Sequence, residues 1–400
     1  MPGKVAVLFD NFGPYHLARL RAAAQQIDLL AVEFASRSGE YAWDASSAHD
    51  EPFQRLTLLS TGTSRDVSCG KFYKILDAHL SSFRPKAVAI PGWSSRRVFS
   101  AMNWCLHTRT PAIVMSASSA HDEIRTPWKE WIKRRYVRLC SAALAGGRMH
   151  FEYLGALGLA RDRIFLGYNA VDNDYFATEA AKIRRQKAEA TKKFGLPEHF
   201  FLASARFINK KNLPRLIDAY SQYRSLAGNE AWDLVLLGDG PLRPILCSQI
   251  QALGLHSCIY LPGFVQYKEL PMYYSLAETF IHASTTEQWG LVVNEAMASG
   301  LPVLVSSRCG CAAELVVEGI NGFNFDPNNI ESMARLMARI SGMDVETRTR
   351  MGRASYRIIS NWGPCRFAQG LRDAVECAIR AGPPRVGLLD RVLLNALLMQ

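Results

Sequence analysis

Thr286–Ser307 reads TEQWGLVVNEAMASGLPVLVSS, and this pattern predicts a loop, a helix and a buried strand in succession. Gly290 precedes the apolar run that begins the helix, and Gly300 and Pro302 end it. Val303–Ser306 is short and almost entirely apolar, as a strand buried on both faces of a parallel sheet is. The stretch is therefore typical of α/β folds, in which parallel strands alternate with helices.

Short apolar runs followed by helical patterns recur along the whole chain. They are continuous rather than alternating, which favours strands of parallel sheets. The expected strands are Val5–Phe9, Leu29–Val32, Ala87–Ile90, Ala112–Ser116, Phe201–Ala205, Leu234–Leu237, Tyr260–Leu261, Thr279–Ile281 and Val303–Ser306. Helical patterns such as Leu213–Leu226 and Ile330–Ile340 separate them. The predicted fold class is α/β, with two Rossmann-like doubly wound domains facing across a cleft.

The chain is long enough for two domains, because 400 residues exceed what one hydrophobic core usually organises. Polar turn residues crowd into GYNAVDNDYF at residues 167–176, and a strong strand pattern follows at Phe201. We expect a first domain over residues 1–165, a linker over 166–177, a second domain over 178–365 and closing helices over 366–400. The last apolar stretch either packs back on the first domain, which we favour, or lies on a membrane.

The composition is that of an ordinary globular protein, with 48% hydrophobic and 21% charged residues. No apolar run reaches the roughly 20 residues that span a bilayer. The opening MPGKVAVLFD leads directly into a strand pattern and does not resemble a signal peptide. The nine cysteines are odd in number and scattered, which favours a reducing compartment over a disulfide framework. We therefore expect a cytoplasmic protein, which can also lie peripherally on the inner face of the cytoplasmic membrane.

The net charge of +11 indicates an anionic partner, such as nucleic acid, anionic lipid or a phosphorylated substrate. Two runs concentrate the positive charge, residues 125–138 and 180–193. The first run also contains Trp128, Trp131 and Tyr136, and a mixture of aromatic and basic residues suits an anionic membrane surface. The alternative for both runs is a solvated helix face.

Two acids flank the loop and the helix start in the quoted stretch. Glu287 precedes Gly290, and Glu295 lies eight positions after Glu287, which along a helix corresponds to ~12 Å. Helix starts attract phosphate, so the backbone around Gly290, Leu291 and Val292 suits a diphosphate. Carboxylates accept hydrogen bonds from hydroxyl groups on either side of such a diphosphate. The pattern points to a nucleotide sugar rather than to an amphipathic helix with an exposed polar face.

Cations for the phosphates follow the strand pattern FLASA. Arg206 comes directly after it, and Lys210 and Lys211 follow. In parallel sheets, ligands bind beyond the carboxyl ends of strands. Basic residues near strand ends are common, but beside the loop of Glu287 they indicate a diphosphate site.

As a set, these motifs resemble the retaining nucleotide-sugar glycosyltransferases of family 4, which have the GT-B fold. The resemblance covers nearly all of the second domain, including LLGDGP at residues 236–241. It implies that Arg206 and Lys211 hold the donor diphosphate and act in catalysis. It further implies that Glu287 is a third catalytic residue, which contacts the donor sugar, and that Glu295 contacts the ribose.

The same resemblance assigns three further positions of the second domain. Val265, in Gly263-Phe-Val265, sits where the family contacts the nucleobase. Gly310 and Glu314, in RCGCAAELVVEGINGF, fall in a following segment that is also typical. We keep Val265 as a donor-binding candidate and Glu314 as a further candidate.

The first domain matches the family less closely. Gly13 lies in a strand-to-helix loop, where the family uses a glycine to approach the diphosphate. His16 follows in the first helical turn and is a candidate contact of the acceptor or the phosphate, with a structural role as the alternative. The family often places a histidine after the strand that corresponds to Ala112–Ser116, and here that segment reads SASSAHDEIR. His121 is our candidate for that role, and helix capping by Ser119 or Asp122 is the alternative.

The resemblance implies transfer of a hexose-type sugar to a glycan, a lipid-linked acceptor or another hydroxyl group, in surface polysaccharide or glycoconjugate synthesis. A nucleotide-sugar epimerase of the same fold is one alternative. A non-catalytic protein that binds sugar nucleotides or nucleic acid is the other, although the chain contains no recognised nucleic-acid-binding motif.

We expect neither a cofactor nor a metal. Asp172 and Asp174 have the spacing of an Asp-x-Asp metal motif but lie in a turn-rich segment, where Asp is a common turn former. Cys309 and Cys311 are separated by one residue and have no nearby histidine in the sequence, which does not suit zinc. Arg206 and Lys211 can balance the diphosphate charge in place of a metal.

Overall fold

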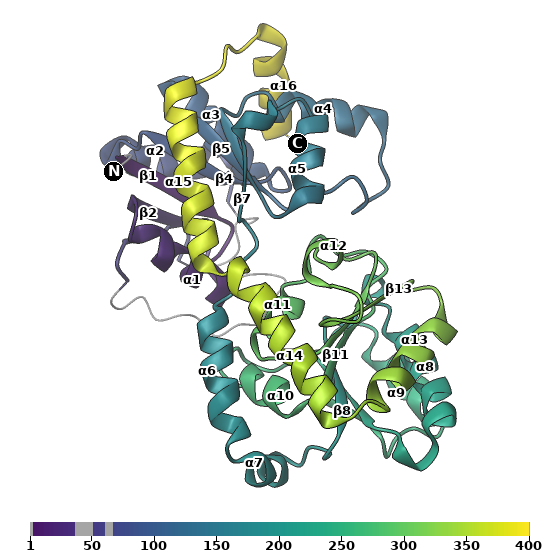
Figure 1. The fold of residues 1–400 in the computed structure, drawn as a ribbon. Coiled ribbons are helices and arrows are strands. Elements are labelled where there is room, and N and C mark those ends of the chain that lie inside the picture. Colours follow the sequence, from purple (N-terminus) through teal and green to yellow (C-terminus); the bar gives the residue numbers. More distant parts are fainter. Residues whose placement is uncertain (1–2, 37–50, 61–66, 400) are drawn as a thin grey trace. The chain divides into compact units, whose positions relative to one another are not determined.

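The structure is a computed structural model that describes residues 3–36, 51–60 and 67–399 (Figure 1). The chain forms two compact α/β units. The first unit combines Met1–Val171 with Pro364–Gln400, and the second is Asp172–Gly363. The second unit is thus inserted between two segments of the first.

The first unit contains a seven-stranded parallel sheet in the order β3-β2-β1-β4-β5-β6-β7. Its strands are β1 (Lys4–Phe9), β2 (Asp28–Glu33), β3 (Gln54–Thr57), β4 (Ala87–Pro91), β5 (Ala112–Ser116), β6 (Ala142–Ala145) and β7 (Ile164–Leu166). The four strands expected here are confirmed. The sequence did not predict β3, β6 and β7.

Helices cover both faces of this sheet. They are α1 (Pro14–Ala24), α2 (Cys69–Phe83), α3 (Arg96–Thr108), α4 (Pro127–Val137), α5 (Arg148–Ala156), α15 (Pro364–Ala381) and α16 (Leu388–Met399). One face packs against α1 and α15, and α15 inserts Phe367, Leu371 and Val375 into that core. The opposite face packs against α2, α3 and α5, and Leu394 of α16 joins this second core. The expectation that the last helices pack on the first domain is confirmed.

The second unit contains a six-stranded parallel sheet in the order β10-β9-β8-β11-β12-β13. Its strands are β8 (Phe200–Ser204), β9 (Asp233–Leu237), β10 (Ile259–Gly263), β11 (Thr279–His282), β12 (Val303–Ser306) and β13 (Gly322–Phe325). The five expected strands are present, and β13 was not predicted. Both sheets are doubly wound, as the sequence indicates.

The helices of the second unit follow the expected alternation with strands. They are α6 (Asn173–Arg184), α7 (Lys187–Phe194), α8 (Leu213–Ala227), α9 (Arg243–Ala252), α10 (Leu270–Leu276), α11 (Leu291–Ala298), α12 (Ala312–Leu315), α13 (Ile330–Ser341) and α14 (Val345–Ile359). A core of α8, α9 and α13 side chains covers one face of the sheet. On the part of the chain that the structure describes, no helix has both the length and the apolar character needed to cross a bilayer.

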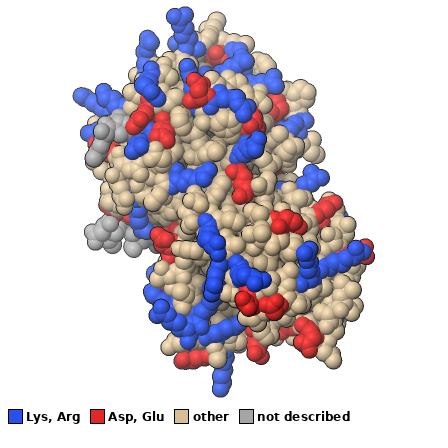
Figure 2. Space-filling view, in the orientation of Figure 1, with Lys and Arg blue, Asp and Glu red and all other residues tan. Residues whose placement is uncertain are grey.

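Each sheet has one point at which the strand order reverses direction. It lies between β1 and β4 in the first unit and between β8 and β11 in the second. In open α/β sheets, ligands bind outside the carboxyl ends of the strands at such a point. On the surface, Lys and Arg side chains are spread among acidic side chains over the face shown in Figure 2 rather than gathered in one stripe.

Candidate active site

Two loops meet at the reversal point of the second sheet, one after β8 and one after β11. Asn212 joins them, because its buried side chain donates hydrogen bonds to the carbonyl oxygens of Ala283 (3.1 Å) and Pro327 (2.7 Å). Asn212 adopts φ = 59°, a left-handed conformation that Asn tolerates better than most residues. The Thr285 N–H donates to the Lys210 carbonyl oxygen at 2.9 Å. These bonds hold the two loops against each other.

The loops bring together two of the predicted catalytic residues. The Lys211 ammonium forms an ion pair with the Glu287 carboxylate. Both side chains are largely buried, with 12% and 13% of their surface exposed. His282, the last residue of β11, lies behind them, with its Nε2 3.6 Å from Glu287 Oε2 and 3.2 Å from Ser284 Oγ. The reversal point therefore holds a compact cluster of one cation, one carboxylate and one imidazole.

The charges of this cluster follow from its surroundings. Burial alone raises the pKa of Glu287, but the hydrogen bond from His282 and the charge of Lys211 outweigh it and hold the pKa well below its usual range. Burial lowers the pKa of His282, although Glu287 opposes this shift. Glu287 is therefore ionised and His282 is largely neutral near pH 7.

The first turn of α11 begins directly after this cluster. Gly290 is its N-cap with φ = 100°, a conformation that is costly for residues with a side chain. The buried Trp289 ring is fixed by a bond from Nε1 to Asn294 Oδ1 at 2.9 Å. The N–H groups of Leu291 and Val292 have no preceding helical turn to bond to, so they suit an anion.

Glu295 lies within α11 and is completely buried. The Tyr274 hydroxyl of α10 donates to its Oε2 at 2.6 Å. Burial and the nearby charge of Glu295 raise the pKa of Tyr274, so the phenol stays protonated. Only Glu295 is helical, because α11 begins at Leu291, after Glu287. The estimate of ~12 Å between the two acids assumed one continuous helix. That assumption is wrong.

The LGDGP motif supports the loop after β8. The Phe207 N–H donates to the Asp239 carbonyl oxygen at 2.8 Å. A Cβ at Gly238 would lie 1.9 Å from the Ala205 carbonyl oxygen, and one at Gly240 would lie 2.8 Å from that of Phe207. The two glycines are needed because the backbones approach this closely.

The segment after β12 supports Glu287 from another side. Glu287 and Cys309 form a parallel β-bridge, and the Gly310 N–H donates to the Glu287 carbonyl oxygen at 3.0 Å. A Cβ at Gly310 would lie 1.9 Å from the Gln288 carbonyl oxygen. Burial, with the Glu287 charge, raises the pKa of the Cys309 thiol, so it stays protonated. Within the described residues, no group of three His, Cys, Asp or Glu could hold a metal ion.

The remaining candidates of the second unit lie around this cluster. Arg206 follows β8 and is half-buried, Val265 follows β10 and is buried, and Glu314 is half-buried on α12. Because all strands of the sheet are parallel, the segments that carry Arg206, Val265 and Glu287 leave it at the same edge.

In the first unit, Gly13 and His16 bond to each other. The Gly13 N–H, which we predicted to approach a diphosphate, donates to His16 Nδ1 at 3.1 Å. His16 packs against Phe9, and burial together with nearby Arg19 lowers its pKa well below the usual value. Buried Glu33 anchors the same loop by accepting from the Phe12 N–H at 2.8 Å. His16 thus acts here as a helix-start partner of Gly13.

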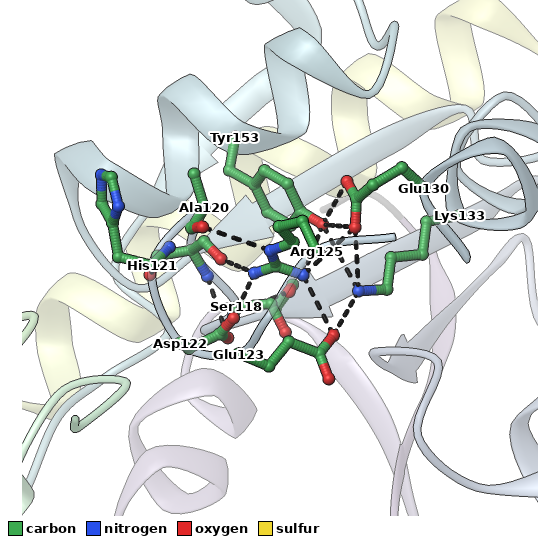
Figure 3. A network of polar contacts seen from close by, with 11 residues as sticks. Ser118, Ala120, His121, Asp122, Glu123, Arg125, Glu130, Lys133 and Tyr153 are labelled. Carbon is green, nitrogen blue, oxygen red and sulfur yellow. Dashed lines mark hydrogen bonds and ion pairs between the residues drawn. The ribbon is translucent and has the colours of Figure 1, made fainter. Parts of the chain in front are cut away.

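His121 lies on the loop after β5 and is exposed, with its ring pointing away from a polar network around Arg125 (Figure 3). Its N–H donates to Ser119 Oγ at 3.3 Å, and the Ser119 N–H donates to Asp122 Oδ2 at 3.1 Å. Ser119 and Asp122 therefore close a turn. They do not cap a helix, because α4 has Thr126 as its N-cap.

Asp172 is the N-cap of α6, and its side chain accepts from the Tyr175 N–H at 3.0 Å. The Asp172 pattern thus reflects helix capping, in agreement with the turn predicted for it. Sequence reasoning missed Asn212, Tyr274 and His282. Their signals were weak: an Asn before a Leu-Pro helix start, a Tyr in an apolar helix, and a His that ends a buried strand.

Part of the second unit is similar to a known family of enzymes. Residues 184–358 match the family model described as "Glycosyl transferases group 1". This segment covers most of the second unit, including the Lys211–Glu287 cluster and α11. This segment is similar to the group 1 glycosyltransferases.

Two curated relatives illustrate the match. An alpha-monoglucosyldiacylglycerol synthase of Acholeplasma laidlawii is 34% identical over 139 residues, which is 34% of each chain. An alpha-D-kanosaminyltransferase of Streptomyces kanamyceticus is 29% identical over 233 residues, which is 58% of each chain. The matches thus span between a third and three fifths of these relatives.

Solved structures share the whole fold. HepE of Anabaena in complex with UDP and glucose has a TM-score of 0.70 at 18% identity, over 94% of this chain and 99% of that chain. Sucrose-phosphate synthase of Thermosynechococcus elongatus has a TM-score of 0.72 at 17% identity, over 92% and 97%. The two Rossmann-like units are therefore those of the GT-B glycosyltransferase fold.

Proposed function

We propose that this protein is a retaining, metal-independent glycosyltransferase of family 4. It moves a hexose-type sugar from a nucleoside diphosphate sugar to a hydroxyl group of a glycan or lipid-linked acceptor. We place it in the cytoplasm and in surface polysaccharide or glycoconjugate synthesis. The main support is the Lys211–Glu287 pair, which lies at the reversal point of the second sheet, before the first turn of α11.

The relatives support a nucleotide-sugar donor and a lipid acceptor. HepE was solved with UDP-glucose, and an Escherichia coli protein of the same fold was solved with UDP-2-fluoro glucose. Two relatives are named for diacylglycerol glycolipid synthesis, from Acholeplasma laidlawii and Streptococcus pneumoniae. A UDP-sugar is therefore the first donor to test.

In the proposed reaction, the bond between the anomeric carbon and the β-phosphate oxygen breaks, and the nucleoside diphosphate leaves with the bonding electrons. Arg206, Lys211 and the α11 amides stabilise the negative charge that develops. The acceptor oxygen forms its new bond on the same face of the sugar, and its proton passes to the leaving phosphate. No cofactor takes part.

The two carboxylates bind the hydroxyl groups of the donor. Glu287 accepts hydrogen bonds from the sugar, and Glu295 accepts them from the ribose. Tyr274 can hold Glu295 at the same time, because a carboxylate offers about four acceptor positions. The ion pair with Glu287 keeps Lys211 at the phosphate position before the donor arrives.

The first experiment is a thermal-shift panel of UDP-, GDP- and ADP-sugars, followed by an assay of nucleoside diphosphate release with and without acceptor. A donor at 100 times its Kd stabilises the folded state by about 2.7 kcal/mol. We expect the sugar nucleotides of one base to raise Tm, and Glu295→Gln to abolish this shift.

A second variant tests catalysis. Lys211→Ala should lower kcat by about 100-fold or more with a smaller effect on donor KM.

Further measurements distinguish the alternatives. Release that depends on acceptor supports the transferase, whereas a new sugar nucleotide made without acceptor would show an epimerase. Dialysis against EDTA should leave kcat unchanged, and the anomeric configuration of the product, read by NMR, should match that of the donor. Near-normal kinetics in both variants, with folding verified, would contradict the site.

A further inference from the structure

We propose that one surface of the first unit binds the interface of an anionic lipid bilayer. This α4–α16 face comprises Ile124, Trp128, Trp131, Leu388, Leu389 and Val392. The exposed fractions of these side chains run from 45% for Trp131 to 90% for Ile124. Among the large apolar residues exposed on the described part of this unit, only Ile379 lies outside the face. Exposed apolar residues that gather in this way mark an interaction surface.

The geometry of α16 separates a packed side from an apolar outer side. Leu394 is buried in the core of the first unit. Leu388 and Val392 are four residues apart and so lie on one side of the helix, roughly opposite Leu394. Arg135 of α4 pairs with Asp390 of α16 at 2.6 Å, so the two helices are neighbours. The apolar side of α16 is therefore held next to α4.

The loop before α4 holds Ile124 outward. Figure 3 shows the cause, a network in which Arg125 is paired with Asp122, Glu123 and Glu130. The Arg125 guanidinium also donates to the Tyr153 hydroxyl at 2.9 Å. The loop is thus anchored on both sides of Ile124, and these contacts keep the Ile124 side chain exposed.

The network also changes the charge expected from the sequence. Arg125 and Lys133 contribute little to an external field, because both pair with Glu123 and Glu130. Lys129, Arg134 and Arg138 are exposed and have no acidic partner in the described parts of the chain. They are the charges available to a partner.

The charges and the side-chain types of the α4–α16 face suit a lipid bilayer as its binding partner. Lys129 lies over the Trp128 ring at 5.7 Å, and Arg135 lies over the Trp131 ring at 6.0 Å. Trp beside Lys and Arg is typical of membrane interfaces, where rings enter the headgroup region and cations meet anionic lipids. The inference deepens the proposed function, because a lipid-linked acceptor lies at such a surface, but its test does not depend on that function.

The test measures how the full chain partitions onto vesicles of neutral phosphatidylcholine and vesicles that also contain phosphatidylglycerol. We expect about tenfold tighter binding to the anionic vesicles, weakened by salt, with a blue shift of tryptophan emission. Trp128→Ser with Trp131→Ser should reduce binding about tenfold or more, and so should Leu388→Ser with Leu389→Ser. The combined substitutions Lys129→Gln, Arg134→Gln and Arg138→Gln should remove the preference for anionic vesicles.

A matched control uses apolar residues of the second unit, Leu226→Ser with Val345→Ser, which are 59% and 68% exposed. The control should bind vesicles like the wild type. Equal losses in the control, or no binding to either vesicle, would overturn the proposal. The proposal would also be overturned if the α4–α16 substitutions dissociated an oligomer and left vesicle binding unchanged. That result would show that the face binds a second copy of the chain. Thermal shifts by the donor should be the same in all variants, so a failure of the proposed function is recognised separately.

Discussion

The Glu287 carboxylate is buried beside a cation, and this fixes its protonation state as well as its place. Removing either partner leaves the other charge buried and uncompensated, which costs about 3–5 kcal/mol for a fully buried pair. Lys211 and Glu287 keep some contact with solvent, so a smaller cost applies. Kinetic variants at this pair therefore need to be compared at a temperature well below their Tm.

The low pKa of Glu287 predicts a specific pH dependence of stability. The unfolded chain takes up a proton near pH 4.3, while the folded chain does not, so this contribution is complete above that pH and is lost as pH falls. Between pH 6 and 3.5 the wild type should lose about 1 kcal/mol more unfolding free energy than Glu287→Gln. Urea denaturation at both pH values measures the difference.

Glu331→Gln is the control for this experiment, because Glu331 forms an exposed i,i+4 pair with Arg335. It should lose stability with pH as the wild type does. If Glu287→Gln also followed the wild-type slope, Glu287 would not be held ionised by Lys211 and His282.

At the scale of elements, close backbone approaches decide which glycines are required. Gly310 lies against the Gln288 carbonyl oxygen, and its Cβ would come within 1.9 Å of that atom. The turn from Glu287 to Trp289 is held by this contact, so any shift of the 309–311 segment moves the Glu287 carboxylate.

Gly310→Ala should therefore destabilise the protein by at least ~2 kcal/mol and raise the donor KM. Gly155→Ala is the control, because Gly155 lies in α5 with no atom within 4 Å of the added Cβ. That change should be neutral or stabilising by up to about 1 kcal/mol. Thermal unfolding of both variants measures the effects. Equal Tm values for the two variants would contradict this prediction, because they would show that the 309–311 segment shifts at little cost in stability.

Most strands that the sequence predicted are continuous runs of β-branched and large apolar residues. Val5–Phe9 and Val303–Ser306 are buried on both faces, and their patterns are unambiguous. Ala142–Ala145 reads AALA, which favours a helix by propensity, yet it forms β6 because the sheet surrounds it. Gly322–Phe325 contains Gly and Asn, which are rare in strands. Tertiary context decided these segments.

The same limit applies to the candidate site. Lys211 and Glu287 are 76 positions apart, and the motifs of the two loops predicted that they lie at one site. The positions of His282 and Tyr274 depend on side-chain packing that no motif encodes. Gly13 and His16 were expected to face a ligand, but their mutual hydrogen bond depends on the exact helix start.

At the scale of the whole molecule, the first unit is built from two distant segments. Helix α15 supplies buried Phe367, Leu371 and Val375 to its core, and α1 packs against α15. The second unit draws on one continuous segment only. We therefore expect the second unit to fold as an isolated fragment, and residues 1–171 of the first unit not to.

The fragment 172–363 should unfold cooperatively by circular dichroism, because it contains its whole core. The fragment 1–171 should lack a cooperative transition, since one face of its sheet loses α15. Joining 1–171 to 364–400 through a short Gly/Ser linker should restore the transition. A cooperative fragment 1–171 would contradict the role assigned to α15.

The ends of the second unit lie next to each other, because the Asn173 side chain donates to the Ile359 carbonyl oxygen at 2.7 Å. A segment with adjacent ends can be excised and replaced as a cassette. Exchange at these two crossings transplants the Lys211–Glu287 cluster, α11 and the loop of Val265 together. If the proposed function holds, chimeras cut at Val171 and Pro364 should therefore take their donor preference from the inserted unit and keep the acceptor preference of the first unit.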